Sequence, residues 1–202
     1  MAPRTYHSEV RARAARETRA TILRAAAELF AGVGYAQATV AAIAERAGVA
    51  VNTVYTSVGG KPALIRALVD EGAGDAEIDA AVAEILKLTD APQILRRLAG
   101  TTGEITRRYA TTLHVLTSNA AADPAVAAAA DAAMERYRSR LRRVASHLAS
   151  SGLVRTDSVR TEQILWFYFG VVAWRSVREF GWEWAEATAW LADQAATALL
   201  PL

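Results

Sequence analysis

The chain of 202 residues carries a net charge of +2 and has 52% hydrophobic residues, which is ample for a packed core. It contains no cysteine, which excludes disulfides and thiolate metal sites and makes a reducing, cytoplasmic compartment the expectation. The N-terminus lacks the apolar core of a signal peptide, and the longest apolar run, Ile164 to Trp174, has eleven residues and is too short to span a bilayer.

Helices are the elements that this composition favours, because alanine is abundant and only five prolines occur. The first predicted helix runs from Thr18 to about Gly32, where apolar residues recur at helical spacing. Gly32 and Gly34 end this helix, and a short connector that begins at Tyr35 leads to Thr39. The expected fold class is therefore all-α.

Residues 39–61, TVAAIAERAGVAVNTVYTSVGGK, have the spacing of a DNA-binding helix-turn-helix. Ala44 is small where a second helix crosses close above it, and Gly48 permits a left-handed turn without a Cβ clash. The hydroxyl of Thr39 is suited to cap the first of the two helices. An ordinary corner between two helices uses the same small-residue turn, so the flanking segments decide between the two interpretations.

These flanks favour DNA binding. Downstream, Gly59 and Gly60 interrupt the chain, and Pro62 suits the first turn of a further helix. Residues 1–66 carry nine Lys or Arg against four Asp or Glu, whereas residues 67–202 carry 14 against 17. Positive charge is thus concentrated where DNA phosphates need neutralising. Further basic candidates for contacts with the DNA backbone or minor groove are Arg4, Arg11, Arg13 and Arg16.

Together these features resemble the tetracycline-repressor (TetR) family of bacterial regulators, in an actinobacterial type. The match covers roughly residues 19–68, from ILRAAAELFAGVGYAQATVAAIAERAGVAVNTVY to the Lys61-Pro62-Ala63-Leu64 start of the next helix. The resemblance implies a helix-turn-helix DNA-binding domain of three helices over residues 1–60 and a helical ligand-binding and dimerisation domain over residues 61–202. The chain departs from the family pattern at Ala50, Ser57-Val58 and Gly60.

The second helix of the motif is predicted to enter the major groove. The amide of Asn52 is suited to pair with adenine N6 and N7, and the methyl group of Thr53 is suited to contact thymine. By resemblance, Lys61 stands at the family's phosphate-contact position. The predicted DNA-binding residues are Thr39, Val51, Asn52, Thr53, Tyr55, Thr56 and Lys61.

The middle of the chain is predicted to hold the small-molecule input of such a regulator. Helical breaks are expected at 72–74, 90–92, 123–124 and 150–152, and residues 91–119 are expected to form one helix or two, interrupted near Gly100–Gly103. Polar groups among aromatic side chains suit a hydrophobic or aromatic ligand, but each is also typical of plain core packing. The ligand-binding candidates are Tyr109, His114, Asn119, Tyr137, Trp166 and Trp174.

The last two helices are predicted over 158–180 and 183–199, with a hinge at Gly181. The segment QILWFYFGVVAWRSV is apolar almost all the way round, and Gly170 inside it indicates close approach of another helix. A buried central helix in a monomer is the alternative. In the family, the corresponding helices pair with a two-fold mate, and such a homodimer reads a palindromic operator in double-stranded DNA. The predicted dimer-interface residues are Gly170, Trp190, Leu191, Ala195 and Ala198.

Catalysis has no support in the sequence. The three histidines lack the HExxH spacing of a zinc site, and no phosphate-binding loop, nucleophile elbow or catalytic carboxylate pair occurs. We therefore predict a non-enzymatic, sequence-specific regulator without cofactor, metal or membrane partner. It is expected to be a repressor that leaves its operator when an effector of unknown identity shifts the helix of residues 62–70. The competing hypothesis is a sequence-neutral architectural DNA-binding protein, which should carry a larger net charge and no apolar dimerisation helix.

Overall fold

The computed structural model describes residues 4–73 and 76–201 of the chain. Its helices are α1 (Arg4–Gly32), α2 (Val40–Ala47), α3 (Val51–Ser57), α4 (Lys61–Ala73), α5 (Ala76–Ile85), α6 (Ala91–Arg108), α7 (Ala110–Asn119), α8 (Pro124–Ser150), α9 (Ser158–Phe169), α10 (Val171–Glu179) and α11 (Trp184–Leu199). The predicted all-α class is confirmed. Within the same residues, no helix combines the length and apolar character that crossing a membrane requires.

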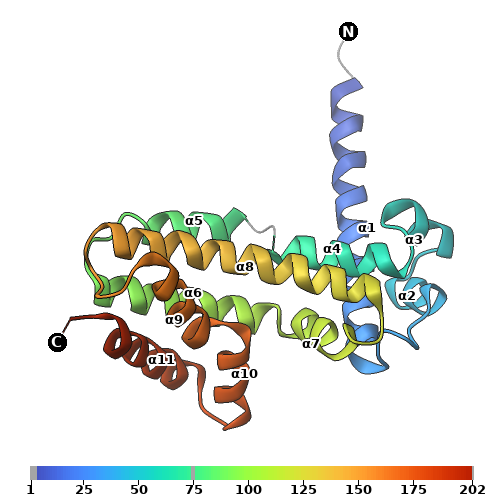
Figure 1. The fold of residues 1–202 in the computed structure, drawn as a ribbon. Helices are drawn as coiled ribbons and strands as arrows, with labels where there is room; N and C mark the ends of the chain where they lie inside the picture. Colours follow the sequence, from blue (N-terminus) through green and yellow to red (C-terminus); the bar gives the residue numbers. More distant parts are fainter. Residues whose placement is uncertain (1–3, 74–75, 202) are drawn as a thin grey trace. The chain divides into compact units, whose positions relative to one another are not determined.

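Two compact units make up the described chain (Figure 1). The first contains the described residues up to 72 together with 111–132, and the second contains 73–110 together with 133–201. The first unit therefore continues past residue 60, where the sequence placed the end of the DNA-binding domain. The expected breaks at 90–92, 123–124 and 150–152 are confirmed, and the one expected at 72–74 extends outside the described residues.

The core of the first unit forms where α1 packs against α2 and α3. Ile22, Ile43 and Val54, one from each helix, are fully buried there. The predicted start of the first helix at Thr18 is wrong, because α1 begins at Arg4. Residues 4–17 lack apolar periodicity, but they are rich in alanine and arginine, which are strong helix formers. Figure 1 shows this part of α1 extending beyond α2 and α3.

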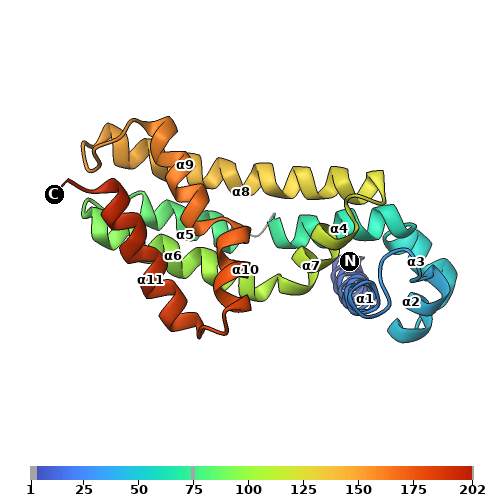
Figure 2. The same cartoon turned by 60° about the horizontal axis from the view of Figure 1, so that its bottom comes forward.

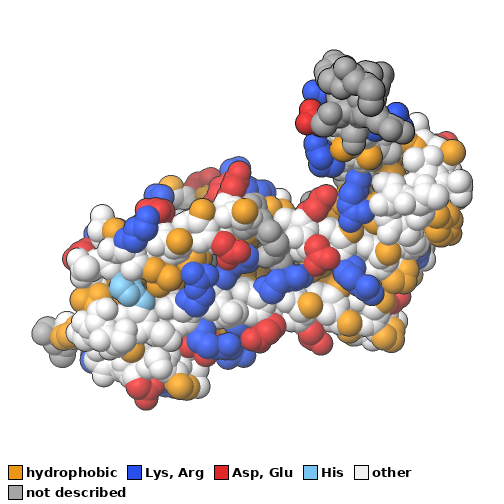
Figure 3. Space-filling model, turned by 90° about the horizontal axis from the view of Figure 1, so that it is seen from above, with side chains coloured by type: hydrophobic (Ala, Val, Ile, Leu, Met, Phe, Trp, Pro, Cys, Tyr) orange, Lys and Arg blue, Asp and Glu red, His pale blue; other side chains and the backbone are white. Residues whose placement is uncertain are grey.

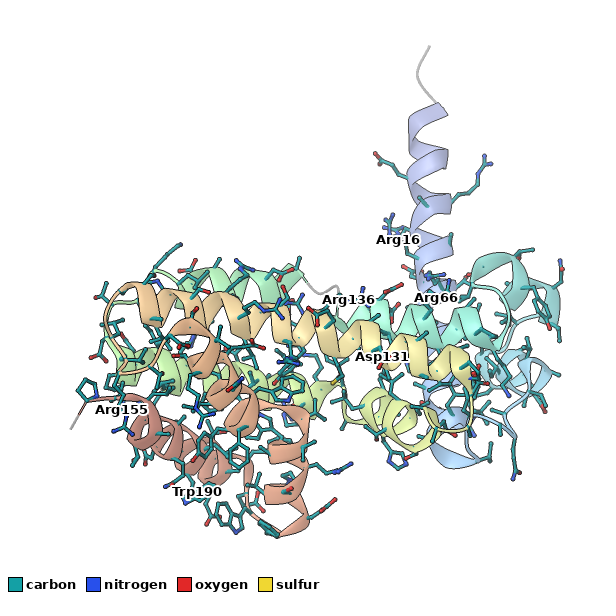
Figure 4. The ribbon with its side chains drawn as sticks, viewed as in Figure 1. Arg16, Arg66, Asp131, Arg136, Arg155 and Trp190 are labelled. Carbon is teal, nitrogen blue, oxygen red and sulfur yellow. The ribbon has the colours of Figure 1, made fainter. Side chains whose placement is uncertain are left out.

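The second unit is organised around α6. Its most extensive contact is with α11, which lies alongside it (Figure 2), and α9 packs against both helices. Apolar residues from six helices meet in one buried cluster, which includes Ile85, Leu95, Leu98, Leu141, Val144, Leu165, Phe169, Trp174 and Leu191. The C-terminal end of α11 is fixed by Arg155, whose Nη2 donates to the Ala198 carbonyl at 2.9 Å (Figure 4).

Two predictions about glycine are wrong. The interruption expected near Gly100–Gly103 does not occur, because α6 runs unbroken to Arg108 and the break falls at Tyr109. The helix expected over 158–180 is divided at Gly170 into α9 and α10.

The physical reasons differ between the two places. A Cβ at Gly103 would lie 2.9 Å from Trp174 Cη2, so this glycine makes room for a ring inside a continuous helix. A Cβ at Gly170 would lie 2.4 Å from the Trp166 carbonyl oxygen, so the sharp change of chain direction there requires glycine. The break at Gly181 is confirmed, with φ at 82°.

Candidate DNA-binding site and effector region

Caps and one left-handed turn hold the helix-turn-helix together. Thr39 caps α2 as predicted, since its hydroxyl accepts a hydrogen bond from the Ala42 N–H at 3.1 Å. Gly48 ends α2 with φ 67° and ψ 32°, the left-handed conformation that glycine adopts without strain. The Val49 N–H then donates to the Ala44 carbonyl at 3.0 Å, which leads the chain directly into α3.

One side of α3 is buried and the other is exposed. Val54 is fully buried against α1 and α2. The exposed residues are Val51, Asn52, Tyr55 and Thr56, and Thr53 is half-buried. None of the described residues forms a hydrogen bond with the Asn52 side chain, so its amide donor and acceptor are both available to a base edge. The structure thus brings the predicted base-reading residues onto one short helix.

Arg19 fixes the C-terminal end of α3 to α1. Its Nη1 donates to the Ser57 carbonyl at 2.8 Å. A cation at this end is favourable, because the helix dipole is negative there and the last carbonyls lack helical partners. No sequence pattern predicts this contact, since the two residues are 38 positions apart.

Lys61, at the start of α4, lies against the connector between α1 and α2. Its Nζ donates to the Ala36 carbonyl at 3.0 Å and lies 4.7 Å from the centre of the Tyr35 ring. Burial is the main cause that raises the pKa of Tyr35, and the charge of Asp123 raises it further. An ammonium has three donors, and one is used here, so two stay available to a phosphate. The residue predicted to contact DNA therefore also has a role in the fold.

Three of the predicted effector residues lie in the second unit, where Trp174 is buried in the core and Tyr137 and Trp166 are half-buried against it. Tyr137 meets Trp166 edge to face at 5.9 Å, and its hydroxyl donates to the Phe169 carbonyl at 2.5 Å. Burial raises the pKa of Tyr137, and a hydrogen bond with Thr102 partly opposes this. Trp174 is fully buried, and its Nε1–H has no partner among the described residues. An unsatisfied buried donor is uncommon and marks a place for an acceptor.

The other three predicted effector residues are divided between the units. Tyr109 ends α6 in the second unit, whereas His114 and Asn119 belong to α7 in the first. His114 is exposed, with Nδ1 at 3.4 Å from the Ser118 hydroxyl. Asn119 donates to the Val115 carbonyl of its own helix at 2.8 Å, which occupies one of its amide donors.

A groove of about 440 Å³ lies between α6 and α11 in the second unit. It is lined by Arg96, Gly100, Gly103, Glu104, Arg107, Trp184, Ala185, Thr188, Ala189 and Ala192. Two of these residues, Gly103 and Trp184, also contact the Trp174 ring. None of the six predicted effector residues lines the groove, whose walls consist of Trp184 and of small or charged residues that carry no sequence signal.

Several large apolar side chains on or next to α9, α10 and α11 are exposed. Phe167, Val172 and Phe180 are 72%, 64% and 70% exposed, and none of them was a predicted site residue. The predicted interface residue Trp190 is 43% exposed and projects from α11 (Figure 4). The other predicted interface residues are less accessible: Gly170, Leu191 and Ala195 are buried within the unit, and Ala198 is half-buried.

Comparison with known proteins agrees with this geometry. Residues 22–68 match the family model described as bacterial regulatory proteins, tetR family. No curated protein is significantly similar to the chain. The solved structure of the SmeT–triclosan complex is 19% identical, with a TM-score of 0.75 and 92% of each chain covered.

Two regulators from Bacillus also share the fold. The fatty acid degradation regulator FadR from Bacillus halodurans is 18% identical, with a TM-score of 0.71 over 88% of this chain and 93% of that one. FadR from Bacillus subtilis, in complex with stearoyl-CoA, is 20% identical, with a TM-score of 0.68 over 87% of this chain and 94% of that one. At such identities the likeness shows the architecture alone.

Proposed function

The chain belongs to the TetR family of bacterial regulatory proteins, and on that basis we propose that it is a sequence-specific transcriptional repressor. It binds a palindromic operator as a homodimer and leaves it when a small hydrophobic or aromatic molecule binds. The observation that carries the proposal is α3, which buries Val54 and exposes four other side chains behind a capped helix and a left-handed turn. A helix presented in this way fits a major groove.

Base reading rests on Asn52. Asn52→Ala should cost about 1–3 kcal/mol of operator affinity and relax the preference at one base step in each half-site. Gln93→Ala is the matched control, because it also truncates an exposed amide, on α6 in the second unit. If Asn52→Ala binds the operator and its single-base variants with unchanged affinity, the assignment of Asn52 to base reading is refuted.

Phosphate contact rests on Lys61. Lys61→Met keeps an apolar stem over the Tyr35 ring but removes the charge and the hydrogen bond to the Ala36 carbonyl, so it preserves the ring packing while removing the DNA contact. The variant should weaken binding to all duplexes alike and reduce the slope of log affinity against log salt by about 2 in a dimer. A full slope in this variant would refute the contact.

The operator itself is found by selecting binding sites from random duplexes with the full chain. We expect an enriched inverted repeat, because two heads related by a dyad read the same half-site twice. Scrambling that repeat should lower the affinity by about 10³-fold or more. A loss of less than about tenfold would favour the sequence-neutral architectural protein instead.

Dimerisation is assigned to the surface that carries the exposed apolar residues Phe167, Val172, Phe180 and Trp190, since exposed apolar surface marks interaction sites. Val172→Glu places a charge in this surface and should give a monomer in sedimentation, where the wild type is a dimer. Val33→Glu, which changes a 52% exposed valine of the first unit, is the control. A wild-type monomer at micromolar concentration would overturn the assignment.

The effector site is assigned to the second unit. Its support is the aromatic group of Tyr137, Trp166 and Trp174, together with the unpartnered Trp174 N–H. Two proteins of this fold have been solved with small molecules, triclosan and stearoyl-CoA. Quenching of tryptophan fluorescence by such compounds, with matching loss of DNA binding, would support the site; quenching without release would exclude that compound as the effector.

Two variants locate the effector contacts. Trp174→Phe removes the indole N–H and should raise the effector concentration that releases DNA. His114→Leu, on the exposed side of α7, leaves release unchanged if the second unit alone holds the effector, and abolishes it if the predicted His114 contact exists. Tyr109 and Asn119 are tested in the same assay.

A further inference from the structure

Residues 9–17 of α1 do not pack against the rest of the first unit. Every residue from Glu9 to Glu17 is exposed, and Figure 1 shows this stretch extending beyond α2 and α3. We call residues 4–18 of α1 the basic arm. Packing supplies most of the stability of protein helices, and in the first unit that packing involves the part of α1 that follows the arm. An unpacked helical arm of this length is therefore suited to a partner that contacts it.

The exposed charges of the arm are mostly positive. Arg11, Arg13 and Arg16 stand against Glu9 and Glu17. Arg13 reaches Glu17 at 4.0 Å, a solvated pair that contributes little, and no described residue pairs with Arg11 or Arg16. Basic side chains are visible along the arm in Figure 3, and Arg16 projects into solvent in Figure 4. The side chain of Arg4, which was also predicted to contact DNA, lies outside the described part.

The position of the arm distinguishes it from an ordinary solvated helix face. The hydrogen bond from Arg19 to the Ser57 carbonyl, 2.8 Å long, joins α1 to the end of the recognition helix α3. The arm leaves the unit directly beyond this contact. At 1.5 Å per residue it spans about 22 Å, the length of about six base pairs at a rise of about 3.4 Å each. Its arginines thus project from the same end of the unit as the helix that reads bases.

We infer that the basic arm binds the DNA that flanks the base pairs read by α3, through phosphate contacts of Arg11, Arg13 and Arg16. This inference rests on the proposed DNA-binding function and adds a contact that does not depend on base sequence. Guanidinium groups suit phosphate oxygens, because their planar array of donors bonds to two oxygens at once. We assign duplex DNA as the partner because the arm leaves the unit next to the end of α3, the helix predicted to read bases.

The test compares the full-length chain with a triple variant, Arg11→Gln, Arg13→Gln and Arg16→Gln. Both are titrated with the duplex selected by the wild type, once with long flanks and once trimmed to the repeat. Trimming should cost the wild type about tenfold or more in affinity at low salt and should leave the triple variant unchanged. The slope of log affinity against log salt should fall by about 3 per bound subunit in the variant, since each phosphate contact contributes about 0.9.

The matched control removes three exposed arginines of the second unit, by Arg96→Gln, Arg97→Gln and Arg160→Gln. It lowers the net charge equally and should behave as the wild type does on both duplexes. All six arginines are exposed, so thermal unfolding should be unchanged in both variants. Loss of flank dependence in the control as well would show a general charge effect and overturn the inference.

Two other results would also overturn it. A triple variant with the wild-type salt slope and the wild-type trimming effect would show that the arm is only solvated. A change of sedimentation in the triple variant, without any change of flank dependence, would show that the arm binds protein instead. If the wild type selects an operator but ignores its flanks, only the arm inference fails, whereas failure to bind any duplex defeats the proposed function itself.

Discussion

A single methyl group at Gly103 tests the packing of the second unit. A Cβ added there lies 2.9 Å from Cη2 and 3.2 Å from Cζ2 of Trp174, closer than ordinary van der Waals contact. Trp174 is fully buried, and the centre of its ring lies 5.9 Å from that of Trp184. The indole therefore cannot move away without displacing its neighbours, because protein interiors are close-packed.

Gly100 provides the matched comparison. It is one turn earlier on α6, it is exposed, and nothing lies within 4 Å of its added Cβ. Glycine to alanine inside a helix stabilises by about 0.5–1 kcal/mol, and Gly100→Ala should show this gain. Gly103→Ala has the same helical gain but also an overpacking cost of about 1–3 kcal/mol. The helical gain cancels in the comparison, so Gly103→Ala should be less stable than Gly100→Ala by about 1–3 kcal/mol.

Urea denaturation followed by circular dichroism measures this difference. Protein concentration is held fixed, because association of subunits shifts the apparent stability. Trp174→Phe in the Gly103→Ala background supplies a smaller ring, so the second change should cost less there than in the wild type. Equal stabilisation by Gly100→Ala and Gly103→Ala would refute the contact between Gly103 and Trp174.

Two further changes test single hydrogen bonds and one titration. Thr39→Ala should lower the free energy of unfolding by about 1 kcal/mol, because α2 loses its cap. Thr39→Ser keeps a capping hydroxyl and should retain most of the wild-type stability. An equal loss of stability in the two variants would exclude the cap. Tyr137→Phe should cost about 1–3 kcal/mol in chemical denaturation, because the Phe169 carbonyl loses its donor. Folding raises the pKa of Tyr137, so the stability should be complete below the ordinary tyrosine pKa of about 10 and should fall as pH rises above it. Tyr137→Phe should flatten that alkaline fall, and an unchanged pH profile would contradict the burial of the phenol.

The helix-turn-helix was predictable because its determinants are local. The cap at Thr39 and the left-handed turn at Gly48 each depend on residues within a few positions, and the structure has both. The contact of Arg19 with Ser57 was not predictable, since it joins helices distant in sequence. Apolar spacing does not extend the first helix over residues 4–17, whereas their helix propensity does.

Glycine explains most of the errors in the second half. The residue disrupts a helix in one setting and permits close packing in another, and the sequence does not say which setting applies. Gly103 lies inside α6 because the Trp174 ring fills the space beside it, whereas Gly170 divides α9 from α10. Leu191 and Ala195 were predicted at a subunit interface from their apolar spacing, but that spacing also serves the core of their own unit, where the structure places them.

The position of Lys61 has a consequence for the entropy of DNA binding. A lysine side chain loses about 1.5–2 kcal/mol of rotamer freedom when it is fixed in one conformation. Here the Ala36 carbonyl and the Tyr35 ring restrict the side chain in the free protein. Most of its ordering therefore occurs on folding, and a phosphate meets an ammonium that is already in place. A lysine without these restraints would carry the same charge but would bind the same phosphate more weakly, because it would lose more rotamer freedom on binding.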